Sequence, residues 1–146
     1  MFHLTLFYRQ GVAGYKFADA ARRATRRWRD AFRAEELADA LVVEQDTLFD
    51  VSAEIQASLE DQAVRQEKAM SDEWVTIIKR NIRSLLATRT KVGLAEDIGA
   101  ILGTTLSLAG EPEIRRAWDQ LAAEGAVRPR DKSQKAMYRL RIISSR

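Results

Sequence analysis

The chain contains no cysteine and a single histidine, His3, among its 146 residues. Without cysteine there is no disulfide, no thiolate nucleophile and no cysteine-ligated zinc or iron–sulfur site. One imidazole has no second histidine with which to hold a metal ion and no evident partner for a catalytic triad. Proline and glycine are also few, at two and seven residues. This composition favours a helix-rich globular domain over a disordered or collagenous chain.

Long hydrophobic runs are missing too. No stretch approaches the ~20 apolar residues of a membrane span, and the apolar residues 2–8 lack the basic lead and cleavage site of a signal peptide. We therefore expect a cytoplasmic protein with no membrane contact. The chain also lacks a phosphate-binding glycine loop and a convergent set of catalytic side chains. We therefore expect a protein that is not an enzyme, has no catalytic residue and binds no cofactor or metal.

Charge, in contrast, is abundant and unevenly distributed. Residues 1–34 carry eight basic and two acidic side chains, whereas residues 35–73 carry two basic and twelve acidic ones. The remaining residues are basic again, with 14 basic and seven acidic side chains. Such a pattern suits contact with a polyanion at the basic ends, and it equally suits self-association between patches of opposite sign.

Residues 1–70 are expected to form a helical arm, basic and then acidic, that serves dimerisation or docking. Residues 2–8 favour a short strand, and apolar residues recur at helical spacing from Phe17 to about Leu41. Residues 41–51 allow a hairpin around Gln45-Asp46 or a continued helix, of which we favour the helix. The apolar stripe along the acidic residues 37–59 predicts a homodimer formed through it.

Six arginines of the first expected helix and the three tryptophans of the chain can each be interpreted in two ways. The arginines are Arg22, Arg23, Arg26, Arg27, Arg29 and Arg33. We favour a solvated face whose charges pair with the acidic segment over direct contact with nucleic acid. Trp28, Trp74 and Trp118 occupy apolar helical positions, so packing in the core is favoured over stacking on bases.

Residues 71–146 are expected to form a second unit of short elements. A helix should begin at Ser71 or Asp72, and a short extended piece at Val92-Gly93 should precede a helix over residues 94–102 that ends at Gly103. A further helix is predicted over residues 112–124, with Pro112 in its first turn and Gly125 at its end. Residues 126–130 and 136–143 then favour two strands of a basic hairpin.

The segment Ile114–Arg130, preceded by Leu94–Gly103, is similar to the winged helix-turn-helix of bacterial transcription regulators, including the gluconate-repressor-type family. The resemblance implies a mostly α fold: a winged helix-turn-helix with a long helical N-terminal arm and a small C-terminal β-hairpin. In that family the second helix enters the major groove of double-stranded DNA and the wing contacts phosphate or the minor groove. The residues expected to contact DNA are Arg115, Arg116 and Gln120 on the helix, and Arg128, Arg130, Lys132, Lys135 and Arg139 on the wing.

Two functions are therefore expected. The first is a non-enzymatic DNA-binding regulator or accessory protein, such as one encoded by a phage or plasmid. The alternative is a winged-helix protein-interaction module that acts as a subunit, assembly factor or inhibitor of a nucleoprotein complex. The alternative arises because Glu111 and Glu113 stand at the tip of the groove-entering helix, where carboxylates oppose phosphate.

Overall fold

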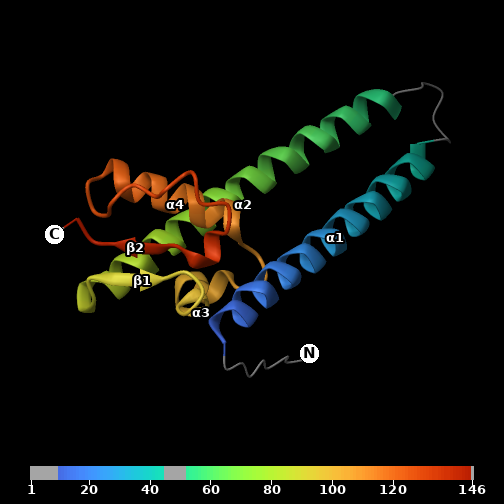
Figure 1. Ribbon diagram of the computed structural model, residues 1–146. Helices are drawn as coiled ribbons and strands as arrows, with labels where there is room; N and C mark the ends of the chain where they lie inside the picture. The colour runs from blue at the N-terminus through green and yellow to red at the C-terminus, as the bar shows by residue number, and fades with distance from the viewer. Residues whose placement is uncertain (1–9, 45–51, 146) are drawn as a thin grey trace.

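The structure, a computed structural model, describes residues 10–44 and 52–145 and consists of two long helices with a small α/β unit between them at one end (Figure 1). The long helices are α1 (Gly11–Glu44) and α2 (Ser52–Thr88). The short elements are β1 (Lys91–Gly93), α3 (Ile98–Leu102), η1 (Gly103–Thr105), α4 (Glu111–Ala123), η2 (Met137–Arg139) and β2 (Arg141–Ile143). The expected mostly helical class with one small sheet is confirmed.

Helix α2 runs unbroken through the position at which a new helix was expected. It contains neither glycine nor proline between Ser52 and Thr88, so nothing interrupts its backbone hydrogen bonds. Ser71 lies inside the helix, and its hydroxyl donates to Glu113 of α4 at 3.4 Å. The predicted helix start at Ser71 or Asp72 is therefore wrong, and the boundary expected between residues 70 and 71 falls within α2.

The sheet is smaller than the expected hairpin and is paired differently. β2 pairs antiparallel with β1, with Val92 opposite Ile142, and residues 126–130 contribute only a bridge between Val127 and Ser144. The strand expected over residues 136–143 is interrupted by η2. Met137 and Ile142 are both buried although they lie five residues apart, an odd spacing that would place them on opposite faces of a straight strand. The turn in η2 brings both into the core.

Helix α3 ends just before Gly103, and helix α4 ends shortly before Gly125. α3 is shorter than the expected helix 94–102, because the Asp97 carboxylate accepts the Gly93 amide at 3.0 Å and holds residues 93–97 in a turn. α4 matches the helix expected over residues 112–124 within a residue at each end. Gly103 and Gly125 both have positive φ angles, of 53° and 71°, as expected of glycines that end helices.

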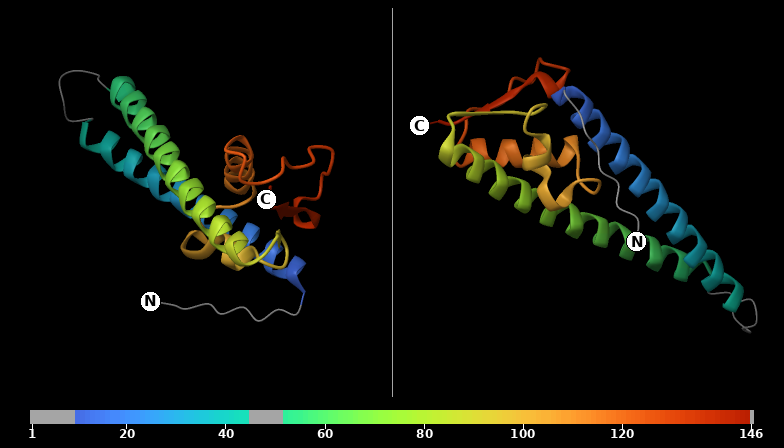
Figure 2. Two further views of the ribbon diagram at one scale, coloured as in Figure 1. Left: turned by 90° about the vertical axis from the view of Figure 1, so that its left-hand side faces the viewer. Right: turned by 90° about the horizontal axis from the view of Figure 1, so that it is seen from below.

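The hydrophobic core lies between the second half of α2 and the short elements. Its fully buried side chains include Ile78, Ile82, Ile101, Leu121 and Ile142. Between Ala18 and Trp74, no side chain that the structure describes is buried. In the right-hand view of Figure 2, α1 and α2 approach each other at one end and diverge toward the other, where α3 and α4 lie between them.

We call residues 26–44 and 52–70 the arm, and residues 11–25 and 71–145 the head. Leu37 and Leu59, which belong to the predicted apolar stripe, line a groove between α1 and α2 in the arm. Leu48 of the same stripe, the expected strand 2–8 and His3 lie outside the described residues.

Within the described ranges, no helix combines the length and apolarity needed to cross a membrane.

Gly125 provides a test of the turn that leads from α4 into the C-terminal segment. Gly125→Ala is expected to lower the free energy of unfolding by about 1–2 kcal/mol, because an alanine at a φ of 71° is strained even though no atom lies within 4 Å of its Cβ. Gly99→Ala is the matched control, since Gly99 lies in α3 with equally open space and should gain about 0.5–1 kcal/mol. Urea denaturation followed by circular dichroism measures both. Equal effects of the two substitutions would contradict the backbone argument.

Candidate nucleic-acid interface

The helix expected to read DNA, α4, is fixed on α2 by its apolar face and exposes the opposite face. Ile114, Trp118 and Leu121 are buried, whereas Pro112, Arg116, Asp119, Gln120 and Ala123 are exposed. Two of the three predicted contact residues of this helix are engaged in ion pairs. Arg115 donates its Nε to Glu111 at 3.0 Å, and Arg116 binds the carboxylate of Asp72 and, at 3.0 Å, the hydroxyl of Ser71. Gln120 has no ion-pairing group and faces solvent.

The N-terminal end of α4 is covered by the first turns of α1. The Tyr15 hydroxyl donates to Glu111 Oε2 at 2.8 Å, and Arg22 Nε lies 3.5 Å from Glu113 Oε2. Burial raises the pKa of Tyr15 and its hydrogen bond to Glu111 raises it further, so the phenol stays a protonated donor. In the winged-helix resemblance, this is the end that reaches the bases. Here another part of the same chain contacts it.

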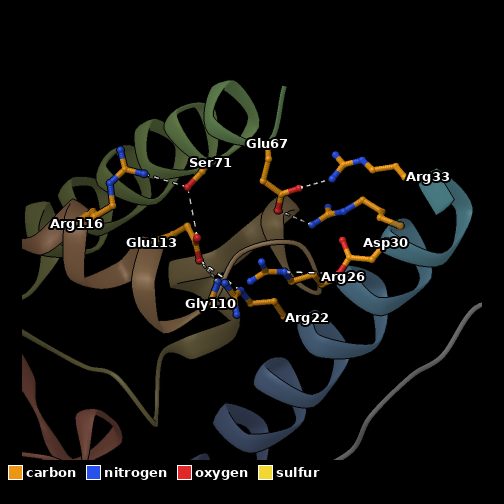
Figure 3. A network of polar contacts seen from close by, with 10 residues as sticks. Arg22, Arg26, Asp30, Arg33, Glu67, Ser71, Gly110, Glu113 and Arg116 are labelled. Atoms are coloured by element: carbon orange, nitrogen blue, oxygen red, sulfur yellow. Dashed lines mark hydrogen bonds and ion pairs between the residues drawn. The ribbon is translucent and has the colours of Figure 1, made fainter. Parts of the chain in front are cut away.

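Glu113 lies at the centre of a polar network that joins α1, α2 and α4 (Figure 3). Its side chain is nearly buried; one oxygen accepts the Gly110 amide at 2.8 Å and the other accepts the Ser71 hydroxyl. Glutamate at the third position of a helix commonly reaches back to the N-cap amide in this way. The expectation that Glu113 stands at a DNA-facing tip is therefore wrong, because its carboxylate points inward. A Cβ at Gly110 would meet the Arg22 side chain, which would have to shift to make room for it.

Half of the arginines in the basic helix α1 turn toward the rest of the chain. Arg29 and Arg33 share the carboxylate of Glu67 on α2, at 3.4 and 3.1 Å, and Arg22 pairs with Glu113. The Arg29 guanidinium also lies 5.3 Å from the centre of the Trp74 ring, a cation–π distance. Glu67 belongs to the acidic segment, so these two pairs agree with the interpretation favoured from the sequence. Arg27 is exposed and forms no ion pair with any described residue.

The cations predicted to lie on a wing divide into those that form ion pairs and those that do not. Arg130 forms a two-pronged contact with Asp119 of α4, at 2.9 and 3.1 Å, which holds the pKa of this guanidinium above its ordinary value. Arg139 is exposed, with its guanidinium 5.6 Å from the centre of the Tyr138 ring. Arg128, Lys132 and Lys135 are exposed and have no acidic partner in the described part of the chain. These three charges are free to meet an external anion.

The segment predicted to be a wing is attached to α4 at its start by the indole of Trp118. Its Nε1 donates to the carbonyl of Arg128 at 2.8 Å. Within the wing, the Asp131 carboxylate accepts the amide and hydroxyl of Ser133, at 2.8 and 2.6 Å, and these bonds lower the pKa of Asp131. The start of the wing is thus anchored beside α4, and Arg128 and Arg130 lie along the same edge of the head.

The three tryptophans do not share one environment. Trp74 and Trp118 are 8% and 2% exposed and belong to the core as predicted. The same prediction is wrong for Trp28, which is 67% exposed and stacks on Phe32. The spacing of apolar residues predicted the wrong environment for Trp28, because α1 turns its arginines, rather than its aromatic residues, toward α2. The signal that could have revealed this is the presence of Glu67 and Glu113, two acids that Arg22, Arg29 and Arg33 needed as partners.

Among the residues that the structure describes, no group of three or more histidine, aspartate or glutamate side chains is arranged to hold a metal ion. Comparisons of the chain with protein-family models, curated proteins and solved structures find no match.

Proposed function

We propose that this chain is a non-enzymatic accessory protein that holds double-stranded DNA by its phosphate backbone through a winged-helix head. The order of elements supports the fold: the second half of α2, β1, α3, α4, a bridging segment at Val127, the wing and β2. β2 lies between β1 and Val127, as the last strand of a winged helix does. The proposed wing is the loop over residues 128–136.

The observation that carries the proposal is the presence of three unpaired cations on that loop. Arg128, Lys132 and Lys135 project from a segment that Trp118 and Asp119 anchor beside α4. Side chains that neutralise phosphates release counterions from DNA, which supplies most of the affinity of sequence-independent binding. The fixed base of the loop positions these charges without using them internally.

Base reading by α4 receives less support than backbone binding. Arg115 and Arg116 are neutralised by Glu111 and Asp72, and α1 contacts the end of the helix that would enter the groove. An arginine that reads guanine must present two of its N–H donors to the base edge. We therefore propose binding that depends weakly on base sequence, with Gln120 as the one uncharged polar side chain of α4 free to approach the bases.

The test is a titration of two unrelated labelled duplexes over a series of salt concentrations. The triple substitution of Arg128, Lys132 and Lys135 by alanine is expected to flatten the slope of log affinity against log salt by about 2.7, since each phosphate contact contributes ~0.9. Fluorescence anisotropy measures the affinity for both duplexes. The parent protein should bind them with similar affinity.

The matched control removes three charges from another surface. Lys16, Arg27 and Lys68 are exposed and form no ion pair with any described residue, so their replacement by alanine changes the net charge equally. This control should retain most of the parent slope. The proposal fails if both triple variants flatten the slope equally, or if the parent does not bind DNA at low salt.

One observation favours the alternative, a protein-interaction module within a nucleoprotein complex. The contact of α1 with the reading end of α4 occupies a surface that a sequence-specific regulator leaves open. In that case the exposed face of α4 would receive a protein, and the wing triple variant would leave DNA affinity unchanged.

A further inference from the structure

Helix α1 exposes a pair of aromatic side chains on a largely apolar face. The rings of Trp28 and Phe32 stack with their centroids 5.7 Å apart, and these side chains are 67% and 49% exposed. The same face of α1 has no charged residue from Phe17 to Phe32. Its other members are small: Ala20, Ala21, Ala24, Thr25 and Ala31. An aromatic pair on a small-residue face is typical of a surface that binds another protein.

The described residues of the arm form no hydrophobic core of their own. None of the arm's described side chains is buried, and Arg29 and Arg33 of α1 form ion pairs with Glu67 of α2. In proteins, most helical stability comes from packing of an amphipathic face rather than from helix propensity. A partner that covers the apolar face of the arm would supply such packing.

A groove lies farther along the arm, and one of its lining residues, Asp39, belongs to the same face of α1 as Trp28 and Phe32. It has a volume of about 470 Å³ and lies between α1 and α2, lined by the apolar side chains of Leu37, Leu59 and Ala63 and by the polar ones of Arg33, Glu36, Asp39, Gln62 and Gln66. Asp39 follows Trp28 by eleven residues and Phe32 by seven. Both spacings return to the same face of an α-helix.

The charges of the arm are complementary to those at the base of α1. Residues 34–64 contain nine acidic side chains and no basic one, whereas residues 11–33 contain seven basic and two acidic ones. Two arms that lie side by side in opposite directions would place the acidic end of each beside the basic half of the other. A parallel arrangement would instead bring like charges together.

We propose that two copies of the chain associate in antiparallel fashion through their arms, with Trp28 and Phe32 of each copy inserted in the groove of the other. A twofold axis that crosses the arm near Arg33 places residue 28 of one copy level with residue 38 of the other, between Leu37 and Asp39. Such an interface is self-complementary, as closed dimers require. Arg27, which has no acidic partner in the described part of its own chain, then lies level with Asp39 of the other copy. The self-association surface thus includes Leu37 and Leu59, as the sequence predicted, together with an aromatic pair that it did not.

The test measures the oligomeric state of the full chain by sedimentation velocity over a range of concentrations and at low and high salt. The parent is expected to dimerise, and more weakly at high salt because the interface joins opposite charges. Trp28→Ala combined with Phe32→Ala should raise the dimer Kd at least about tenfold, since buried aromatic anchors carry most of the energy of an interface. Circular dichroism checks that the variant keeps its helix content.

Val64→Ala is the matched control. Val64 is as exposed as Trp28, at 68%, but it lines a different groove, together with Arg26 and Asp30. This variant should dimerise like the parent. A parent that remains monomeric at every concentration would overturn the proposal, as would an aromatic variant that dimerises with the parent's Kd.

A mixing experiment tests the reciprocal geometry. Leu59→Arg should block the groove while leaving Trp28 and Phe32 in place, so that this variant alone is monomeric. Mixed with the aromatic variant, it should form a heterodimer, because one intact aromatic pair then meets one intact groove. Recovery of association in the mixture supports the insertion of the pair in the groove, and its absence contradicts it.

Discussion

Trp118→Ala is expected to lower the free energy of unfolding by about 3–5 kcal/mol, whereas Trp28→Ala should cost less than about 1 kcal/mol. The two substitutions are chemically identical, and both tryptophans occupy apolar helical positions in the sequence. In the structure, however, Trp118 is 2% exposed and Trp28 is 67% exposed. Removal of Trp118 leaves a cavity beside Ile114 and Leu121 and also leaves the carbonyl of Arg128 without its indole donor. Urea denaturation at low protein concentration, where association does not contribute, measures the difference.

Trp118→Phe separates the two contributions. The phenyl ring keeps most of the buried apolar area but cannot donate to Arg128, so we expect a loss of about 1–3 kcal/mol. The wing should then be less firmly anchored, and DNA affinity should fall even where the head remains folded. If Trp118→Ala and Trp28→Ala destabilise the protein equally, the placement of Trp118 in the core is incorrect.

Glu113→Ala is expected to cost about 2–4 kcal/mol, because it removes a nearly buried carboxylate that holds three groups at once. The Gly110 amide loses its acceptor, Arg22 loses its acid and Ser71 loses its hydrogen bond. Glu111→Gln is the matched control at the same helix end: its amide oxygen can still accept from Tyr15, and the ion pair it loses, with Arg115, is partly exposed, so it should cost less. Chemical denaturation of both variants gives the comparison.

A double-mutant cycle with Arg22→Ala tests whether this carboxylate joins α1 to the head. The losses from Glu113→Ala and Arg22→Ala should not add, because each change removes the same contact. Additive losses would mean that Arg22 and Glu113 act separately and that Glu113 serves only as the cap of α4.

The sequence predicted the elements whose signals are local. Helix α4 has Pro112 at its start and Gly125 at its end, and the apolar spacing of Ile114, Trp118 and Leu121 identifies its buried face. Its limits were accordingly predicted within a residue. The start expected at Ser71 failed because an N-cap residue is also tolerated within a helix when its side chain has another partner, in this case Glu113.

The parts of the candidate site that could not be predicted depend on contacts between distant residues. Glu111 lies four residues before Arg115, a spacing at which helical ion pairs form. Nothing near Arg116 in the sequence indicates its pairing with Asp72 of α2, and nothing near Glu111 indicates its contact with Tyr15. Tyr15 and Glu111 are 96 residues apart. The exposure of Trp28 has the same origin, since which side of an amphipathic helix faces inward depends on the elements against which it packs.

The continuity of α2 makes the molecule a lever. This helix has 37 residues, and because its second half supplies Ile78 and Ile82 to the core, it is rigidly embedded in the head. At 1.5 Å per residue it is about 55 Å long, so that a tilt of the head by about 10° displaces the far end of the helix by about 10 Å. A molecule that binds the arm would therefore set the angle at which the proposed wing meets its target. The distance between the binding site on the arm and the proposed wing on the head would be determined by the number of residues in α2 rather than by a linker.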